Sequence, residues 1–248
     1  MVGCEGGRTC AEQGHRRRLA VNDRIVAAIP GIDLPGLRRY LAGAIGCDPS
    51  EIVVAMISGG RSNLTYLVSA GDRQYVLRRP PLGHVLATAH DLGREYRVMK
   101  ALYATGLPVP PTVLFEDDGS VIGAPFIVSE FVAGPVIRTA QQAAELTPGQ
   151  ARAVAFDLVD RLAQLHGIDP RSIGLATFGR PAGFMRRQIQ RWLVQWEQSA
   201  PDDDVPMRPL AAALLARIPA EMSQALVHGD YRLDNTILNA SDPGRIAA

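Results

Sequence analysis

The sequence predicts an α+β chain with a strand-rich N-terminal part and a mostly helical C-terminal part. Up to about residue 130, short apolar runs bounded by turn residues indicate strands, and only the segment 90–104 has helical spacing. After Thr147, two long segments repeat their apolar residues at helical intervals. At 248 residues the chain is long enough to form two lobes with a sizeable core.

The N-terminal part is expected to hold one sheet and one long helix, preceded by a short helix at 34–45. Its strands are expected near 52–57, 64–69, 74–78, 112–115 and 126–130. The long helix at 90–104 carries its apolar stripe on residues 92, 96, 99 and 102 or 103.

The C-terminal part is expected to open with a helix after Thr147, which suits an N-cap, and Pro148, which suits the first helical position. Its apolar face is expected to hold Ala155, Leu158, Leu162 and Leu165. A second helix carries Phe184, Gln188, Trp192 and Trp196. Aromatic residues at this spacing usually belong to a core, although in a cleft they could line an acceptor site.

Composition and charge exclude several classes of function. A net charge of +1 gives no electrostatic argument for binding nucleic acid or an anionic membrane. Residues 1–20 lack the apolar run of a secretory signal, so we expect a disordered tail or an unused upstream start. Cys4, Cys10 and Cys47 lack ligand spacing, which disfavours a zinc site or a disulfide framework and favours the cytoplasm.

The most informative segment is 226–238, where an apolar pair leads into His228-Gly229-Asp230 and Asn235 follows. We expect a strand, a loop and a second strand here. The Asp-x4-Asn spacing is the one that phosphoryl transfer uses, with Asp accepting a hydroxyl proton and Asn holding Mg²⁺. The alternative is a tight turn, because Asp and Asn are ordinary turn residues.

A glycine-rich turn at 58–63 is the first of three upstream features that phosphoryl transfer also requires. Glycines let the backbone approach a phosphate closely, and the Ser62 hydroxyl and backbone N–H groups can donate to it. A plain β-hairpin explains the same residues equally well.

The second feature is the strand that ends in Arg78 and Arg79, and the third is Glu95 on the helix at 90–104. A strand ends in the two arginines, of which only one can point inward because side chains alternate. Glu95 lies beside the helical stripe, and an inward carboxylate needs a cationic partner such as the strand arginine. The alternatives are a solvated basic edge and a solvated Glu95 that contacts its helical neighbours.

With these features in order, the chain resembles the aminoglycoside phosphotransferase and choline kinase family, which has a two-lobed protein-kinase-like fold. The motifs S-G-G-R-S-N-L-T-Y, Y-V-L-R-R-P-P and V-H-G-D-Y-R-L-D-N are similar to a subgroup related to the kinase-like domain of acyl-CoA dehydrogenase fusion proteins. The resemblance covers 34–248. It implies a nucleotide-binding N-lobe at 34–130, with an antiparallel sheet and one long helix, and a C-lobe at 131–248, truncated at its C-terminus, that carries the catalytic loop.

The resemblance implies a role for each matching residue and ATP and Mg²⁺ as cofactors. Asp230 would be the catalytic base and Asn235 a metal ligand, while His228 braces the loop. Arg78 would take the place of the strand lysine of protein kinases, with Glu95 as its partner. The Ser129 carbonyl and the Phe131 N–H would meet adenine. The residues that cover the phosphates would be Ser58, Gly59, Gly60, Ser62 and Asn63.

The implied reaction is transfer of the γ-phosphoryl group of ATP to a hydroxyl of a small molecule. The subgroup favours a hydroxyacyl-CoA-like acceptor over an aminoglycoside, and an acyl-CoA dehydrogenase as a partner. The family's second metal-binding Asp is expected beyond Ala248, and Asp242 lies in a turn at the wrong end of the next strand. The alternative is therefore a truncated, non-catalytic protein that binds a nucleotide or a partner.

Overall fold

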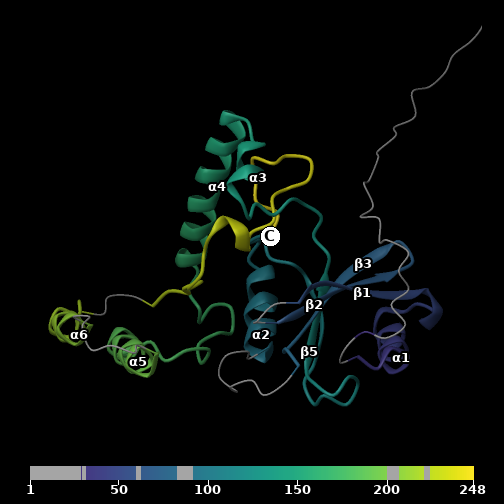
Figure 1. Ribbon diagram of the computed structural model, residues 1–248, viewed down its shortest axis with the longest axis horizontal. Coiled ribbons are helices and arrows are strands. Elements are labelled where there is room, and N and C mark those ends of the chain that lie inside the picture. The colour runs from purple at the N-terminus through teal and green to yellow at the C-terminus, as the bar shows by residue number, and fades with distance from the viewer. Residues whose placement is uncertain (1–28, 30–31, 60–62, 83–91, 200–206, 221–223) are drawn as a thin grey trace, which may run out of the picture.

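The computed structural model describes residues 29, 32–59, 63–82, 92–199, 207–220 and 224–248. Within these ranges the fold is α+β, with a sheet in the N-terminal half and helices in the C-terminal half (Figure 1). The expected fold class is thus confirmed. The expected tail at 1–20 lies outside the described residues.

A five-stranded antiparallel sheet forms the N-lobe, in the order β1-β2-β3-β5-β4. Its strands are β1 Ile52–Gly59, β2 Leu64–Ala70, β3 Arg73–Arg79, β4 Thr112–Glu116 and β5 Phe126–Glu130. Alternation along β3 buries Tyr75, Leu77 and Arg79 on one face. The intervening Arg78 therefore points to the opposite face.

Two helices cover the two faces of this sheet. Helix α1, Leu34–Ile45, has the expected bounds and buries Leu37 and Leu41 in the same core as Tyr75 and Leu77. Helix α2, Leu92–Tyr103, lies on the face to which Arg78 points, because Arg78 pairs with a residue of this helix. The sheet therefore presents Arg78 toward α2 and keeps its main core under α1.

The C-lobe contains four helices within the described residues: α3 Ala140–Ala144, α4 Pro148–Gly167, α5 Phe184–Ser199 and α6 Met207–Ala216. The predicted N-cap of α4 is confirmed. The Thr147 hydroxyl accepts from the Gln150 N–H at 3.2 Å, and the Gln150 side chain accepts from the Thr147 N–H at 2.9 Å. Across the described helices, no stretch combines the length and the apolar character needed to cross a membrane.

The two lobes meet in a cluster of leucines. Leu102 of α2 packs with Leu107, with Leu165 of α4 and with Leu226, which comes just before the predicted catalytic loop. A separate cluster lies under α4 and contains Val154, Leu238 and Ile246. Both ends of the segment 226–238 are thereby packed against α4 or its neighbours.

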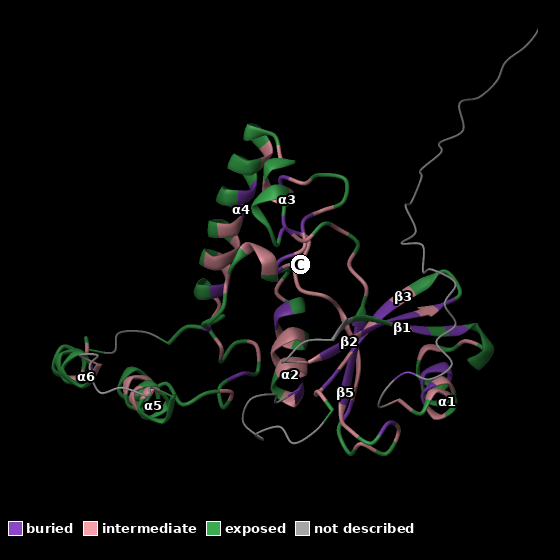
Figure 2. Cartoon of the chain, in the orientation of Figure 1, coloured by how far each residue is buried: buried purple, intermediate pink, exposed green. Residues whose placement is uncertain are grey.

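One prediction about a buried helix face is correct in part, and another is wrong. On α4 the expected Leu165 is buried and the expected Leu158 packs against a buried cluster, whereas Ala155 is exposed and the neighbouring Val154 and Asp157 are buried. Helix α5 has no buried residue, and Trp192 is 61% exposed, so its aromatic residues do not form a core. Figure 2 shows the exposed surface along α5 and α6, which pack mainly on each other.

The two strands expected around the catalytic loop are also absent from the described residues 224–248. Leu226 packs into the leucine cluster instead of pairing with a strand. Leu238 forms an isolated antiparallel bridge with Ile246. The short 3-10 helix η2, Leu233–Asn235, lies in the chain between Leu226 and Leu238. The expected opening of a strand near Arg245 is therefore reduced to this one bridge.

Candidate active site

The structure brings Asp230 and Asn235 into direct contact. The Asn235 amide nitrogen donates to the Asp230 carboxylate at 2.8 Å and to the Asp230 backbone carbonyl at 2.9 Å. Helix η2 makes this possible, because its tight turn brings position 235 back beside position 230. The Asp230 side chain remains 68% exposed, so a substrate can reach its carboxylate.

His228 and Gly229 shape the loop around Asp230. The His228 Nδ1 atom accepts a hydrogen bond from the Asp230 backbone N–H at 3.3 Å, and its ring meets the Tyr231 ring edge-on at 5.4 Å. Gly229 has φ of 84°, a left-handed conformation that favours glycine. These contacts are those of a residue that braces the loop, which is the role expected for His228.

Arg232 is a site residue that sequence reasoning missed. Its Nε lies 2.7 Å from an oxygen of Asp234 and 3.5 Å from an oxygen of Asp230. The alternation of Asp, Arg and Asp at positions 230, 232 and 234 was the available signal. Arg232 therefore places a positive charge beside the Asp230 carboxylate.

Arg78 and Glu95 form the expected ion pair. Arg78 Nη1 of β3 donates to Glu95 Oε1 of α2, and the two side chains are 40% and 25% exposed. The other strand arginine, Arg79, is buried on the opposite face, in agreement with the expected alternation. The pair joins the sheet to α2 and fixes the direction of the Arg78 guanidinium.

Strands β1 and β2, which flank the glycine-rich segment, pair antiparallel. Ser58 lies opposite Thr65 and Gly59 opposite Leu64, with an irregularity in register after Met56. Gly60 and Ser62, two of the expected phosphate contacts, lie outside the described residues. The side-chain oxygen of Asn63 is buried and has no hydrogen-bond partner among the described residues.

The structure does not leave the expected adenine contacts free. The Phe131 N–H donates to the Gln74 carbonyl at 3.0 Å. Ser129 is buried within the sheet, opposite Val76 of β3 and Thr112 of β4. The sheet pairing therefore continues one residue beyond the end of β5, and the expected adenine contact of Phe131 is wrong for this structure.

A cavity of about 1100 Å³ opens next to the catalytic loop. Its lining includes Val227 and Gly229 of the loop, residues of α5 and the connection that precedes α5. Four arginines line it, and none of its described lining residues is acidic; the arginines are Arg94, Arg171, Arg180 and Arg187. The charged residues of the lining are therefore all arginines, one of which, Arg171, also pairs with Asp169 at 3.4 Å, and the cavity adjoins the segment that carries Asp230.

Comparison with known proteins places the chain in a family. The model of the phosphotransferase enzyme family matches residues 53–248. Acyl-CoA dehydrogenase family member 11 from Gallus gallus is 39% identical over 84% of the chain, and the protein of that name from Homo sapiens is 35% identical over 83%. The chain spans about a quarter of the length of these relatives, 26% in each case.

Solved structures agree with the family match. A protein from Ralstonia eutropha, described as an aminoglycoside phosphotransferase, is 32% identical, with a TM-score of 0.74 over 87% of this chain and 63% of its own. The ternary complex of the aminoglycoside phosphotransferase APH(4)-Ia with AMP-PNP and hygromycin B, at 17% identity and a TM-score of 0.61, shares the fold. The family match covers both the hairpin and the catalytic loop, and the chain therefore belongs to the phosphotransferase enzyme family, among homologues of the kinase-like part of acyl-CoA dehydrogenase family members 10 and 11.

Proposed function

We propose that the chain transfers the γ-phosphoryl group of ATP to a hydroxyl group of a small molecule. The observation that carries the proposal is the contact between the exposed Asp230 carboxylate and Asn235. Asp230 accepts the proton of the acceptor hydroxyl while the hydroxyl oxygen bonds to the γ-phosphorus and the bond to ADP breaks. Asn235 and Arg232 hold the carboxylate in place for this step.

In this proposal the N-lobe at 34–130 binds the nucleotide and the C-lobe at 131–248 supplies the catalytic loop. The Arg78 guanidinium, directed by Glu95, lies at the end of β3 and offsets the charge of the phosphates. The hairpin from Ser58 to Asn63 covers the phosphates, and the buried side-chain oxygen of Asn63 is available to a donor from the loop or the nucleotide.

Among the residues present, Asn235 can supply one ligand of a magnesium site. Both hydrogen bonds of the Asn235 side chain use its amide nitrogen, which leaves the amide oxygen for a cation. The described residues contain no cluster of three acidic, histidine or cysteine side chains that could hold a metal. Asn235 would therefore hold Mg²⁺ together with phosphate oxygens, and the ion would offset the phosphate charge.

The cavity favours an anionic acceptor over an aminoglycoside. Aminoglycosides carry several positively charged amino groups, and four arginines would repel them. A hydroxyacyl-CoA-like compound carries phosphate groups that arginine binds well, and apolar side chains such as Phe178 and Phe184 line the same space for an acyl chain. The similarity to acyl-CoA dehydrogenase family members supports this acceptor and a dehydrogenase as a partner. The proposed cytoplasmic location rests on the cysteine pattern alone.

The role of Asp230 is tested by Asp230→Asn. This change keeps the shape of the side chain and removes its capacity to accept a proton, so we expect phosphoryl transfer to fall by about 10²-fold or more. ATP affinity, measured by titration calorimetry, should change by less than about threefold, because the carboxylate does not bind the nucleotide. Turnover at the wild-type rate in this variant would contradict the assignment.

A further inference from the structure

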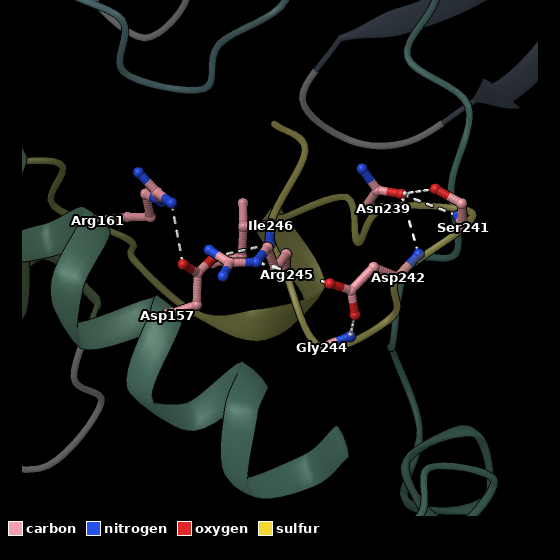
Figure 3. Close-up of polar contacts among 8 residues, drawn as sticks. All are labelled: Asp157, Arg161, Asn239, Ser241, Asp242, Gly244, Arg245 and Ile246. Carbon is pink, nitrogen blue, oxygen red and sulfur yellow. Dashed lines mark hydrogen bonds and ion pairs between the residues drawn. The ribbon is translucent and has the colours of Figure 1, made fainter. Parts of the chain in front are cut away.

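Asp157 is a buried carboxylate on α4 that the proposed reaction does not use. Its side chain is almost fully buried, and each of its two oxygens accepts a hydrogen bond (Figure 3). One oxygen accepts from the backbone N–H of Ile246 at 2.7 Å, and the other from Arg161 Nη2 at 3.0 Å. A buried carboxylate is costly unless it is paired and hydrogen-bonded, so this arrangement ties Ile246 firmly to α4.

Ile246 belongs to a short ladder that begins two residues after Asn235. The Ala247 N–H donates to the Ile237 carbonyl at 2.7 Å, and the Ile237 N–H donates to the Ala248 carbonyl at 2.7 Å. Next to these two hydrogen bonds, Leu238 and Ile246 form the antiparallel bridge. Because Asp157 holds one side of this ladder, it also limits the movement of the other side, which leads directly into the catalytic loop.

A second contact ties the other end of the loop to the next residue of α4. The Tyr231 hydroxyl donates to the Leu158 backbone carbonyl at 2.9 Å. Burial raises the pKa of this hydroxyl and the nearby Asp157 carboxylate raises it further, which keeps the hydroxyl a neutral donor. The stretch from Asp230 to Asn235 is therefore held at both ends by consecutive residues of one helix.

We propose that Asp157 is a positioning residue that fixes the catalytic loop through the backbone of Ile246. A carboxylate is required at this position because two donors approach it from different sides, and an amide could accept from only one of them. The consequence for catalysis rests on the proposed phosphoryl transfer, whereas the effect on the loop does not.

The experiment compares Asp157→Ala and Asp157→Asn with the wild-type chain. Hydrogen exchange is followed by mass spectrometry in peptides covering 228–236 and 237–248, and kcat and KM for ATP are measured alongside. In Asp157→Ala we expect exchange in both peptides to be about tenfold faster or more, because a charge-assisted hydrogen bond is lost. We expect kcat to fall by about tenfold and KM for ATP to stay within about twofold.

Asp157→Asn should change the exchange rates and kcat less than Asp157→Ala does, because its amide oxygen can still accept from the Ile246 N–H. If Asp157→Ala does not fold, Asp157→Asn takes its place in the comparison with the wild type. Asp160→Ala is the matched control, since Asp160 is an exposed carboxylate on the same helix. Unchanged exchange in 228–236 would overturn the proposal, as would an equal rise in exchange throughout the N-lobe sheet. If the wild type neither binds ATP nor transfers phosphate, the proposed function fails while the exchange data still decide the role of Asp157.

Discussion

At the scale of single residues, the site depends on how Asp230 is surrounded. Asn235 donates to its carboxylate, Arg232 lies beside it, and its own N–H donates to His228. The spacing of Asp230 and Asn235 predicted a base and a metal ligand in one loop, and the structure adds that their side chains are in contact. The alternation of Asp, Arg and Asp was a signal for Arg232, but its contact with Asp230 also depends on the turn of η2, which spacing alone does not predict.

Removal of the Glu95 carboxylate should weaken ATP binding. In Glu95→Ala the Arg78 guanidinium loses its partner and its fixed direction, so we expect a loss of about three- to tenfold in affinity, modest because the pair is partly exposed to solvent. Titration calorimetry with ATP measures this change. Glu95→Gln, which keeps a hydrogen-bond acceptor, should lose less. Unchanged affinity in Glu95→Ala would remove the pair from the nucleotide site.

Glu116 provides a test of stability against pH. Burial raises the pKa of the Glu116 carboxyl, and the neighbouring Asp118 carboxyl raises it further. The folded chain therefore holds this proton more tightly than the unfolded chain. The resulting stabilisation is present below the unfolded-state pKa and is lost as pH rises through the folded-state pKa.

We therefore expect Glu116→Gln, which cannot ionise, to raise Tm at pH 7 by more than it does at pH 4. Thermal unfolding of both proteins at the two pH values gives the comparison. An equal difference in Tm at both pH values would show that Glu116 does not titrate abnormally.

At the scale of elements, a close backbone contact at Gly134 holds the segment after β5 against the segment that follows Asn235. A Cβ atom at Gly134 would lie 1.8 Å from the Leu238 carbonyl oxygen, so only glycine fits there without movement of the backbone. The Leu238 N–H donates to the Pro135 carbonyl at 2.9 Å at the same place. The segment after β5 is thereby fixed to the segment after Asn235.

Gly134→Ala should lower the free energy of unfolding by about 2–3 kcal/mol, because a methyl group must displace backbone atoms. Gly149→Ala is the matched control, since it lies in the first turn of α4 with open space around the position of its Cβ atom. We expect the control to be neutral or slightly stabilising. Urea denaturation compares the two variants, and equal stabilities would contradict the close approach.

The sequence predicted most of the elements that depend on local signals, apart from α3 with its Thr139–Gln142 capping box, and missed several features that depend on tertiary contacts. Every strand of the sheet and the Thr147 cap follow from apolar runs and capping residues in the printed sequence. The strands expected around Asp230 did not form, because their apolar residues pack into clusters under α4 and α2. The exposed face of α5 and the buried Asp157 could not be inferred, since helical spacing does not reveal which partner covers a face.

At the scale of the whole molecule, the proposed phosphotransferase site draws its residues from both the sheet part and the helical part of the chain. The sheet and α2 supply the Arg78–Glu95 pair, and the segment 226–248 supplies Asp230 and Asn235. The resemblance of the ordered motifs predicted the family that the comparisons show. The charge of the cavity required the structure, because its four arginines come from separate segments of the chain.

The most direct test is to incubate the chain with ATP, Mg²⁺ and an acyl-CoA that bears a hydroxyl on its acyl chain. Mass spectrometry then follows the acceptor, with Asp230→Asn as the blank and an aminoglycoside as the competing acceptor. Our account predicts that the acyl-CoA gains one phosphoryl group while ATP becomes ADP, that the blank is inactive and that the aminoglycoside is unchanged. Phosphorylation of the aminoglycoside alone would contradict the assigned acceptor, and ATP consumption equal in the wild type and the blank would contradict the assigned chemistry.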